Sequence, residues 1–337
     1  MQYRRMGRTG LKVSEFCLGT MTFGHGTSEH DAERIVREAL DAGVNFFDTA
    51  NAYSDGQSEI MLGKALQGHR DQAVVATKFF NPMGTGPNDS GMSRRHIMRA
   101  IDDSLKRLRM EYVDLYYIHH VDVQTPIEEA LRAIDDLIHQ GKVCYAACSN
   151  YPAWRLSEAL WTSERHGLHR IECYQPQYSL VVRDIEQEIL PLCRHTDLGV
   201  VCWGPLAGGF LSGKYAPGSR RLEGTRSAEG WVFSESWFAA SADQTLETVL
   251  RIARELGRSP AQVALRWVLD RPGITAAIAG ARTIEQWRDN LGCVGWSLPE
   301  EAMRELTAVS ALPDRYPESI EKSMHLRRDN AVRSPTR

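Results

Sequence analysis

The sequence predicts an α/β protein in which eight strands alternate with helices and close into a barrel. Eight short apolar runs recur along the 337 residues, and segments with helical spacing lie between them. A strand followed by a helix, repeated eight times, implies right-handed crossovers and a parallel sheet. This number of units favours a closed (β/α)8 barrel of the TIM type, while an open doubly wound sheet remains the alternative.

The strands are expected at eight runs rich in β-branched or aromatic residues: 15–20, 45–50, 73–78, 113–119, 143–149, 172–178, 199–204 and 274–280. Between them, residues 31–42 and 95–108 show the clearest helical spacing, with apolar side chains three and four positions apart. The expected helix starts are Ser28, Ser93 and Thr125 as N-caps, with Pro126 at a first helical position. The expected helix stops are Gly43, Gly141 and Gly257.

Some segments fall outside this alternation. Residues 1–14 are expected to form a hairpin that closes the floor of the barrel, and residues 214–240 form a long loop rich in Gly, Arg and Ser. With no linker in sight, we expect residues 1–310 to form a single barrel domain with extra loop and helix segments at its C-terminal side. Residues 311–337 are expected to be a polar C-terminal tail.

Composition and charge exclude several classes of protein. Hydrophobic residues make up 42% of the chain and charged residues 25%, which suits a large buried core rather than a disordered chain. The net charge of −3 and the lack of a basic stripe argue against nucleic acid as a partner. No apolar run is long enough for a signal peptide or a membrane span, so we expect a cytoplasmic protein that does not bind membranes.

The seven cysteines are scattered singly and form no C-x-x-C pair. This pattern is typical of reduced thiols in the cytosol rather than of a disulfide framework or a zinc cage, so we expect no metal.

Polar or ionisable residues follow nearly every predicted strand, where the loops of such barrels form the active site. They are Asp48, Lys78, His119, Ser149 with Asn150, Gln175, Trp203 and Gly280. Asp48 and Lys78 each follow an apolar run and are expected to pair, because buried charges are rare unless paired. The simpler interpretation is a structural ion pair between the second and third strands.

Tyr53 lies five residues after Asp48 and can lean back over the same pocket. An adjacent ammonium stabilises a phenolate and lowers the pKa of a phenol, which makes Tyr53 a candidate general acid. On the fourth strand, alternation allows only one of two histidines to face the pocket, and we assign His119 inward and His120 to the rim. A structural imidazole is the alternative for His119.

Two segments are candidates for binding phosphate. Residues 203–215 hold Gly204, Gly208, Gly209 and Gly213 before Lys214, and backbone amides in such a loop can approach a phosphate closely. After the eighth strand, Arg282 can hold a phosphate monoester, and Gln286 with Asn290 can bond a base edge. Helix capping and ordinary surface polarity are the alternatives there. Trp203 is either core or a flat face that stacks on a ring.

Several motifs, in order, resemble the aldo-keto reductase superfamily over about residues 1–310. They are MQYRRMGRTGLKVSEFCLGTMTFG, FFDTANAYSDGQSEIMLGKAL, VVATK, SLKRLRMEYVDLYYIHHVD, SNY, QPQY, WGPLAGGFLSGKY and GARTIEQWRDN. The resemblance implies a catalytic tetrad of Asp48, Tyr53, Lys78 and His119. Tyr53 would protonate a carbonyl oxygen, Lys78 held by Asp48 would lower the pKa of Tyr53, and His119 would orient and polarise the carbonyl.

The resemblance also implies NADP(H) extended across the barrel mouth, with Arg282 favouring NADPH over NADH. The implied cofactor-binding residues are Gly19, Thr20, Met21, Asp48, Ser149, Asn150, Gln175, Trp203, Gly204, Pro205, Leu206, Gly208, Gly213, Lys214, Gly280, Arg282, Gln286 and Asn290. Expected substrate contacts are Phe23, Tyr53, Phe79, His119 and His120, with Phe80 and the Trp-bearing stretch 231–238 as further pocket walls.

The sequence departs from the family pattern at YSDG, HHVD, WGPL and AIAGA, which bears on loop shape and substrate preference. The leading hypothesis is an NADPH-dependent carbonyl reductase that acts on a small-molecule aldehyde or ketone. A Schiff-base aldolase using Lys78 is one alternative. Another is a cofactor-binding auxiliary subunit with little turnover, since some members of the family resemble subunits that assemble with a channel. Homo-oligomerisation, the substrate and the direction of reaction stay open.

Overall fold

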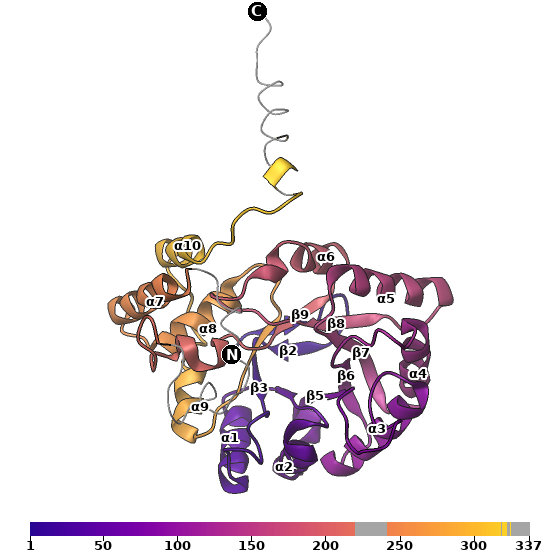
Figure 1. Cartoon of the computed structure of the whole chain (residues 1–337). Helices are drawn as coiled ribbons and strands as arrows, with labels where there is room; N and C mark the ends of the chain where they lie inside the picture. Colours follow the sequence, from indigo (N-terminus) through magenta and orange to yellow (C-terminus); the bar gives the residue numbers. More distant parts are fainter. Residues whose placement is uncertain (220–240, 318, 322–323, 325–337) are drawn as a thin grey trace, which may run out of the picture.

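The computed structural model describes residues 1–219, 241–317, 319–321 and 324. Its centre is a closed barrel of eight parallel strands (Figure 1). The strands are β3 (Phe16–Gly19), β4 (Phe46–Asp48), β5 (Val74–Phe79), β6 (Val113–Ile118), β7 (Val143–Ser149), β8 (Ile171–Gln175), β9 (Gly199–Cys202) and β10 (Ala276–Ala279). Neighbours pair in chain order, and β10 pairs with β3 to close the barrel. The predicted fold and all eight predicted strand positions are therefore confirmed.

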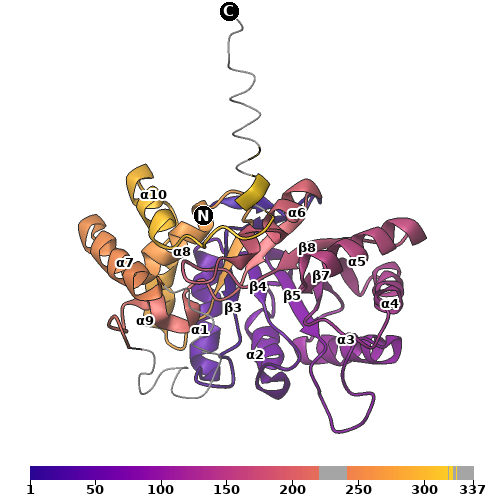
Figure 2. The ribbon, with the colours of Figure 1, turned by 45° about the horizontal axis from the view of Figure 1, so that its top comes forward.

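Helices surround the barrel, as Figures 1 and 2 show from two directions. They are α1 (Glu29–Asp41), α2 (Gln57–Ala65), α3 (Arg94–Leu108), α4 (Ile127–His139), α5 (Ala153–His166), α6 (Ile189–His195), α7 (Ala242–Leu256), α8 (Pro260–Asp270), α9 (Ile284–Leu291) and α10 (Glu300–Val309). Both α7 and α8 lie between β9 and β10, and α10 packs against α7. These are the extra helical segments expected near the C-terminal side.

An antiparallel hairpin precedes the barrel, formed by β1 (Tyr3–Arg5) and β2 (Lys12–Ser14). The hairpin covers the amino-terminal ends of the strands. Met6 in its turn is buried against Gly199, the first residue of β9, and Ser14 donates its backbone N–H to Asn45 just before β4. The prediction of a hairpin at the floor of the barrel is confirmed.

Alternation along each strand divides the core into two layers. Phe46 points into the barrel with Cys17, Leu115 and Tyr117, whereas Phe47 joins the layer between strands and helices. The helices complete the outer layer with their apolar faces, for example Ile35 and Val36 of α1. Burial of this apolar area on both faces of the sheet is the main stabilising contribution.

Most of the predicted helix ends are confirmed. Ser28 and Ser93 cap α1 and α3 by accepting a backbone N–H, and Gly43, Gly141 and Gly257 follow helices with positive φ. Thr125 is not an N-cap, because its hydroxyl donates to the Asp122 carboxylate instead. Pro126, with ψ of 134°, is itself the cap residue of α4 rather than its first helical residue.

Two predictions lie partly or wholly outside the described residues. The long loop 214–240 is described only up to residue 219, and the Trp-bearing stretch 231–238 is outside the description. Most of the predicted tail beyond residue 317 is outside it as well. Within the described part of the chain, no helix is long and apolar enough to span a bilayer.

Candidate active site

A pocket of about 760 Å³ lies at the carboxyl ends of the barrel strands. Residues following every one of the eight strands line it, as the barrel fold requires of a site at this end. The expected catalytic residues Asp48, Tyr53 and His119 are among the lining residues, and Lys78 lies buried beneath them. The fold thus brings together side chains from three neighbouring strands and one loop.

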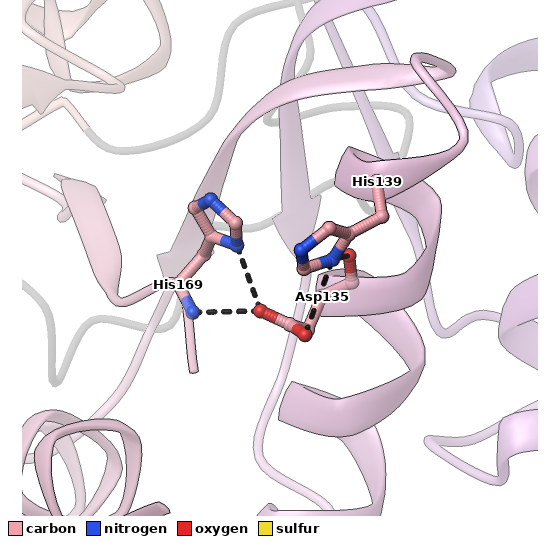
Figure 3. A group of neighbouring side chains, drawn as sticks. All are labelled: Asp135, His139 and His169. Carbon is pink, nitrogen blue, oxygen red and sulfur yellow. Dashed lines mark hydrogen bonds and ion pairs between the residues drawn. The ribbon is translucent and has the colours of Figure 1, made fainter. Parts of the chain in front are cut away.

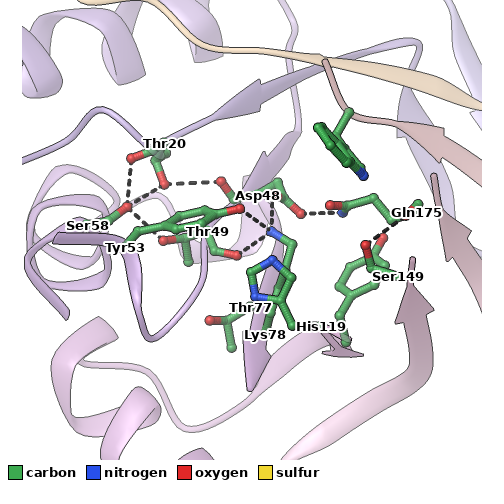
Figure 4. Close-up of polar contacts among 12 residues, drawn as sticks. Thr20, Asp48, Thr49, Tyr53, Ser58, Thr77, Lys78, His119, Ser149 and Gln175 are labelled. Carbon is green, nitrogen blue, oxygen red and sulfur yellow. Dashed lines mark hydrogen bonds and ion pairs between the residues drawn. The ribbon is translucent and has the colours of Figure 1, made fainter. Parts of the chain in front are cut away.

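Asp48 and Lys78 form the ion pair that the sequence predicts, at the base of the pocket (Figure 4). Asp48 is the last residue of β4, and Lys78 is the penultimate residue of the adjacent β5. The Lys78 ammonium donates to Asp48 Oδ1, to the backbone oxygen of Thr49 at 2.7 Å and to the Tyr53 hydroxyl at 3.3 Å. All three protons of this ammonium therefore have acceptors.

This environment keeps Lys78 charged. Burial disfavours the ammonium, but the Asp48 carboxylate and the Tyr53 oxygen outweigh it and raise the pKa of Lys78 above its ordinary value. Asp48 in turn accepts a second hydrogen bond, from Gln175 Nε2 at 2.8 Å, so both carboxylate oxygens have donors. With Lys78 0% exposed and Asp48 2% exposed, the pair is screened little by solvent.

Tyr53 is held over Lys78 by an unusual turn. It begins the short 3₁₀ helix η1 (Tyr53–Gly56), in which Ser54 and Asp55 have φ of 50° and 52°. Residues with a Cβ rarely adopt such left-handed values, because the conformation is strained. The strain persists where the surrounding structure imposes it, often at functional sites. This turn falls at the YSDG segment, and α2 follows it directly.

His119 lies beside Tyr53, with ring centroids 5.9 Å apart and an edge-on geometry. Burial, the Lys78 ammonium and His120 together lower the pKa of His119 to about 2, so its imidazole is neutral at physiological pH. Both histidines line the pocket, with rings stacked 4.5 Å apart. The expectation that only one could face the pocket is wrong, because β6 ends at Ile118 and strand alternation stops there.

The four residues expected around a nicotinamide line the pocket and are joined by hydrogen bonds. Ser149 donates its hydroxyl to the Gln175 backbone oxygen, and Trp203 Nε1 donates to Asn150 Oδ1 at 3.1 Å. Asn150 Nδ2 also donates to the His119 backbone oxygen. The Asn150 amide is therefore held by two hydrogen bonds, one that it accepts and one that it donates.

The Gly-rich segment after β9 forms the short helix η4 (Ala207–Ser212) along the pocket wall. Gly204, Pro205, Leu206, Gly208 and Lys214 line the pocket as expected. Gly213 does not. It faces α8 instead, since a Cβ there would come 2.9 Å from Pro260 Cγ, and its φ of 85° ends η4.

The residues after β10 reach the same wall. Gly280, Arg282, Gln286 and Asn290 all line the pocket, with Gln286 and Asn290 one turn apart on α9. Their amides also bond to backbone: Gln286 Oε1 accepts from the Arg282 N–H, and Asn290 Nδ2 donates to the Gly280 oxygen. Gly280 permits close approach to β3, because a Cβ there would lie 2.6 Å from the Gly19 oxygen. Thr20 and Met21 complete this side.

Two expected substrate contacts, Phe23 and Phe79, belong to the core instead. Both are fully buried in the layer between strands and helices, and neither lines the pocket. Phe79 follows the inward-facing Lys78 on β5, so alternation turns it outward against Tyr116. Phe80 packs on His120 but is not a lining residue.

Several residues that organise the site escaped the sequence analysis. Ser58 of α2 hydrogen-bonds the hydroxyls of Thr20 and Thr49 and so ties three segments together beneath Tyr53 (Figure 4). Asn81 and Gln177 also line the pocket. Short polar residues carry no periodic signal, and the Thr49 acceptor is a backbone atom that every residue has, so sequence alone offered no sign of them.

Comparison with known proteins gives matches over most of the chain. The model for the Aldo/keto reductase family matches residues 15–311. An uncharacterized oxidoreductase of Bacillus subtilis, YrpG, is 42% identical over 320 residues, which are 92% of this chain and 96% of that protein. A probable voltage-gated potassium channel subunit beta of Oryza sativa subsp. japonica is 38% identical over 299 residues, 86% of this chain and 90% of that one. A putative subunit of the same kind from Schizosaccharomyces pombe is 36% identical over 302 residues, 87% and 88% of the two chains.

Proposed function

The chain belongs to the aldo/keto reductase family, and on that premise we propose that it reduces an aldehyde or ketone with NADPH, using Tyr53 as general acid. The family and the Bacillus relative support an oxidoreductase with a nicotinamide cofactor. The finer assignment rests chiefly on one observation. The Tyr53 hydroxyl lies between the pocket and an ammonium held charged by a buried carboxylate.

Each polar side chain then has a definable task. A substrate carbonyl oxygen near the Tyr53 hydroxyl would accept its proton, and the Lys78 ammonium would stabilise the phenolate left behind. Asp48 keeps Lys78 protonated and in place. The neutral imidazole of His119 can donate an N–H to the same carbonyl oxygen without adding a competing positive charge. A bound reduced nicotinamide would supply the hydride that goes to the carbonyl carbon.

The residues present fit such a cofactor. A pocket of about 760 Å³ suits an extended ligand. Gly208 and Gly280 have no side chain to cover their backbone on the pocket wall. Lys214 and Arg282 supply positive charges on the same wall. We assign Arg282 to the 2′-phosphate that distinguishes NADPH from NADH, because guanidinium groups bind phosphate in a bidentate manner. Ser149, Asn150, Gln175 and Trp203 would orient the nicotinamide over Tyr53.

Replacement of Tyr53 by Phe tests the proposal. The variant removes one hydroxyl and leaves the ring in place, so we expect kcat for aldehyde reduction to fall at least about 100-fold. Binding of NADPH, followed by quenching of Trp fluorescence, should change little. Turnover that survives in the variant would refute the role of Tyr53, and a wild-type protein that neither binds nor oxidises NADPH would refute the function.

The Schiff-base alternative is disfavoured by the surroundings of Lys78. That chemistry needs a neutral, accessible amine. Lys78 is fully buried, has three acceptors, and has a raised pKa. Reductive trapping with borohydride and a carbonyl compound should therefore leave Lys78 unmodified.

The auxiliary-subunit alternative has support in the names of two relatives, which are described as potassium channel beta subunits. It predicts tight NADPH binding, very slow NADPH oxidation with every aldehyde, and a stable homo-oligomer by light scattering. Brisk turnover by a monomer would exclude it. We retain the reductase as the main proposal, with a cytoplasmic location that the seven free cysteines support.

A further inference from the structure

Asp135, His139 and His169 form a cluster of side chains (Figure 3). The order of the elements places it at the end of the barrel opposite the pocket. His139 is the last residue of α4, shortly before β7 begins, and His169 lies two residues before β8. The opposite ends of these two strands carry Ser149 and Gln175, which line the pocket. The cluster therefore lies away from the site of the proposed reduction and does not line the pocket.

Helix geometry and a short turn bring the three side chains together. Asp135 and His139 are four residues apart on α4 and so share one face. His169 follows the end of α5, where Gly167 with φ of 63° turns the chain. The Asp135 carboxylate accepts from both the backbone N–H of His169 at 2.8 Å and its Nδ1 at 2.7 Å. The backbone bond holds His169 beside the carboxylate, whereas Nδ1 must release its proton and this hydrogen bond when an ion binds.

The distances suit a small divalent ion. One donor atom from each residue lies within 4.8 Å of the other two. Asp135 Oδ1 is 2.7 Å from His169 Nδ1, and Asp135 Oδ2 is 3.4 Å from His139 Nδ1. Two ligands of a tetrahedral zinc, with bonds of about 2.0–2.1 Å, lie roughly 3.3 Å apart. His139 Nδ1 also lies 2.9 Å from the backbone oxygen of Asp135. Each imidazole therefore exchanges its present hydrogen bond for the ion, and small side-chain rotations bring the three donors together.

Accessibility and charge also favour entry of a cation. The side chains of His139 and His169 are 66% and 49% exposed, while that of Asp135 is 13% exposed. The neighbouring cations are engaged elsewhere: Arg132 with Glu128, and Arg170 with the backbone oxygens of Ile171 and Thr196. An ion from solvent would meet two imidazoles over one partly desolvated carboxylate, with no ammonium or guanidinium directed into the cluster among the described contacts.

We propose that Asp135, His139 and His169 bind a divalent transition-metal ion, with Zn²⁺ as the representative. This departs from the expectation of no metal, which rested on the scattered cysteines and did not consider histidine and carboxylate donors. Two imidazoles and one carboxylate are donors suited to Zn²⁺, Co²⁺, Ni²⁺ and Cu²⁺, whereas Mg²⁺ and Ca²⁺ require six or more oxygen ligands. Water would complete the coordination. The ion joins α4 to the segment that leads into β8 and so stabilises the fold at the floor of the barrel.

Titration of untagged, chelator-treated full-length protein with Zn²⁺ in a calorimeter tests this site. We expect saturable binding of one ion that excess Mg²⁺ does not prevent. Thermal unfolding should shift upward by a few degrees when Zn²⁺ is well above its Kd. His139→Ala and His169→Ala should each weaken binding by at least about tenfold, as loss of a metal ligand requires.

His166→Ala is the matched control. This histidine also ends a helix and lies 3.4 Å from a carboxylate, that of Glu128, but it is outside the cluster. It should bind Zn²⁺ as wild type does. Circular dichroism without metal checks that each variant is folded. If His139→Ala does not fold, His139→Gln takes its place. Absence of saturable binding, or equal affinity in wild type and both ligand variants, overturns the proposal.

Discussion

At the scale of single residues, the pocket sets the protonation of its side chains through burial and one ion pair. Lys78 stays charged because Asp48 and Tyr53 are its neighbours, and His119 stays neutral because burial and that same ammonium oppose a second positive charge. The Tyr53 phenol lies beside the fixed Lys78 ammonium and the neutral His119 imidazole. Its proton can therefore move without a large change in the net charge of the pocket. This is the feature most useful to the proposed reduction.

The pKa of His119 makes a prediction about stability. The group is neutral in the folded state down to a pH of about 2, while an unfolded histidine takes up a proton below about 6.5. Its contribution to stability is therefore complete above pH 6.5 and declines as the pH falls, by up to about 1.4 kcal/mol per pH unit. We expect the free energy of unfolding, measured with urea between pH 7 and 5, to depend less on pH in His119→Gln than in wild type.

The exposed His30 provides the control for this measurement. His30→Gln should follow the wild-type pH dependence of the free energy of unfolding. If His119→Gln keeps the same slope as wild type, the imidazole is not held neutral by its surroundings.

At the scale of elements, the position of Tyr53 depends on α2. This helix follows η1 without a linker and packs against the end of α3, where Glu59 accepts from Arg107 at 2.6 Å. Gly63 is buried at this contact, and a Cβ there would come 2.6 Å from the Leu108 carbonyl carbon. The two helices therefore approach as closely as backbone allows, and any addition at Gly63 must push α2 and its preceding turn outward.

Gly63→Ala should destabilise the protein even though alanine is the better helix former. The gain in helix propensity is about 1 kcal/mol, whereas overpacking against backbone costs about 1–3 kcal/mol. We expect a net loss of up to about 2 kcal/mol in urea unfolding, together with a lower kcat because Tyr53 is displaced. Gly10→Ala, where an added Cβ meets nothing within 4 Å, should be neutral. A more stable Gly63→Ala protein would show that α2 has room to spare.

At the scale of the whole molecule, closure of the barrel places one pocket in contact with every strand. Residues from the ends of β3 to β10 line it, and the hairpin seals the opposite end. We propose on this basis that residues 1–310 unfold as one domain. A ligand bound at the mouth then stabilises all eight units together rather than one segment.

NADPH should accordingly raise the unfolding temperature of the whole chain. At a concentration of about 100 Kd, the stabilisation is about 2.7 kcal/mol. Far-UV circular dichroism and Trp fluorescence should report the same single transition, shifted equally. In Arg282→Ala, NADPH should raise the unfolding temperature much less than in wild type. Any rise caused by NADH should be nearly the same in both proteins. Two transitions, of which only one responds to NADPH, would contradict a single domain.

The sequence by itself determined the order and type of the elements and the residues at the strand ends. Periods of 2 and 3.6 are local properties, and capping by Ser28 or Ser93 involves neighbours along the chain. The tertiary structure decided which side chains share a space. Phe79 points outward because Lys78 points inward, Gly213 packs on Pro260, and His169 meets Asp135 across 34 residues. Such contacts depend on how strands and helices pack, and no local pattern in the chain records that packing.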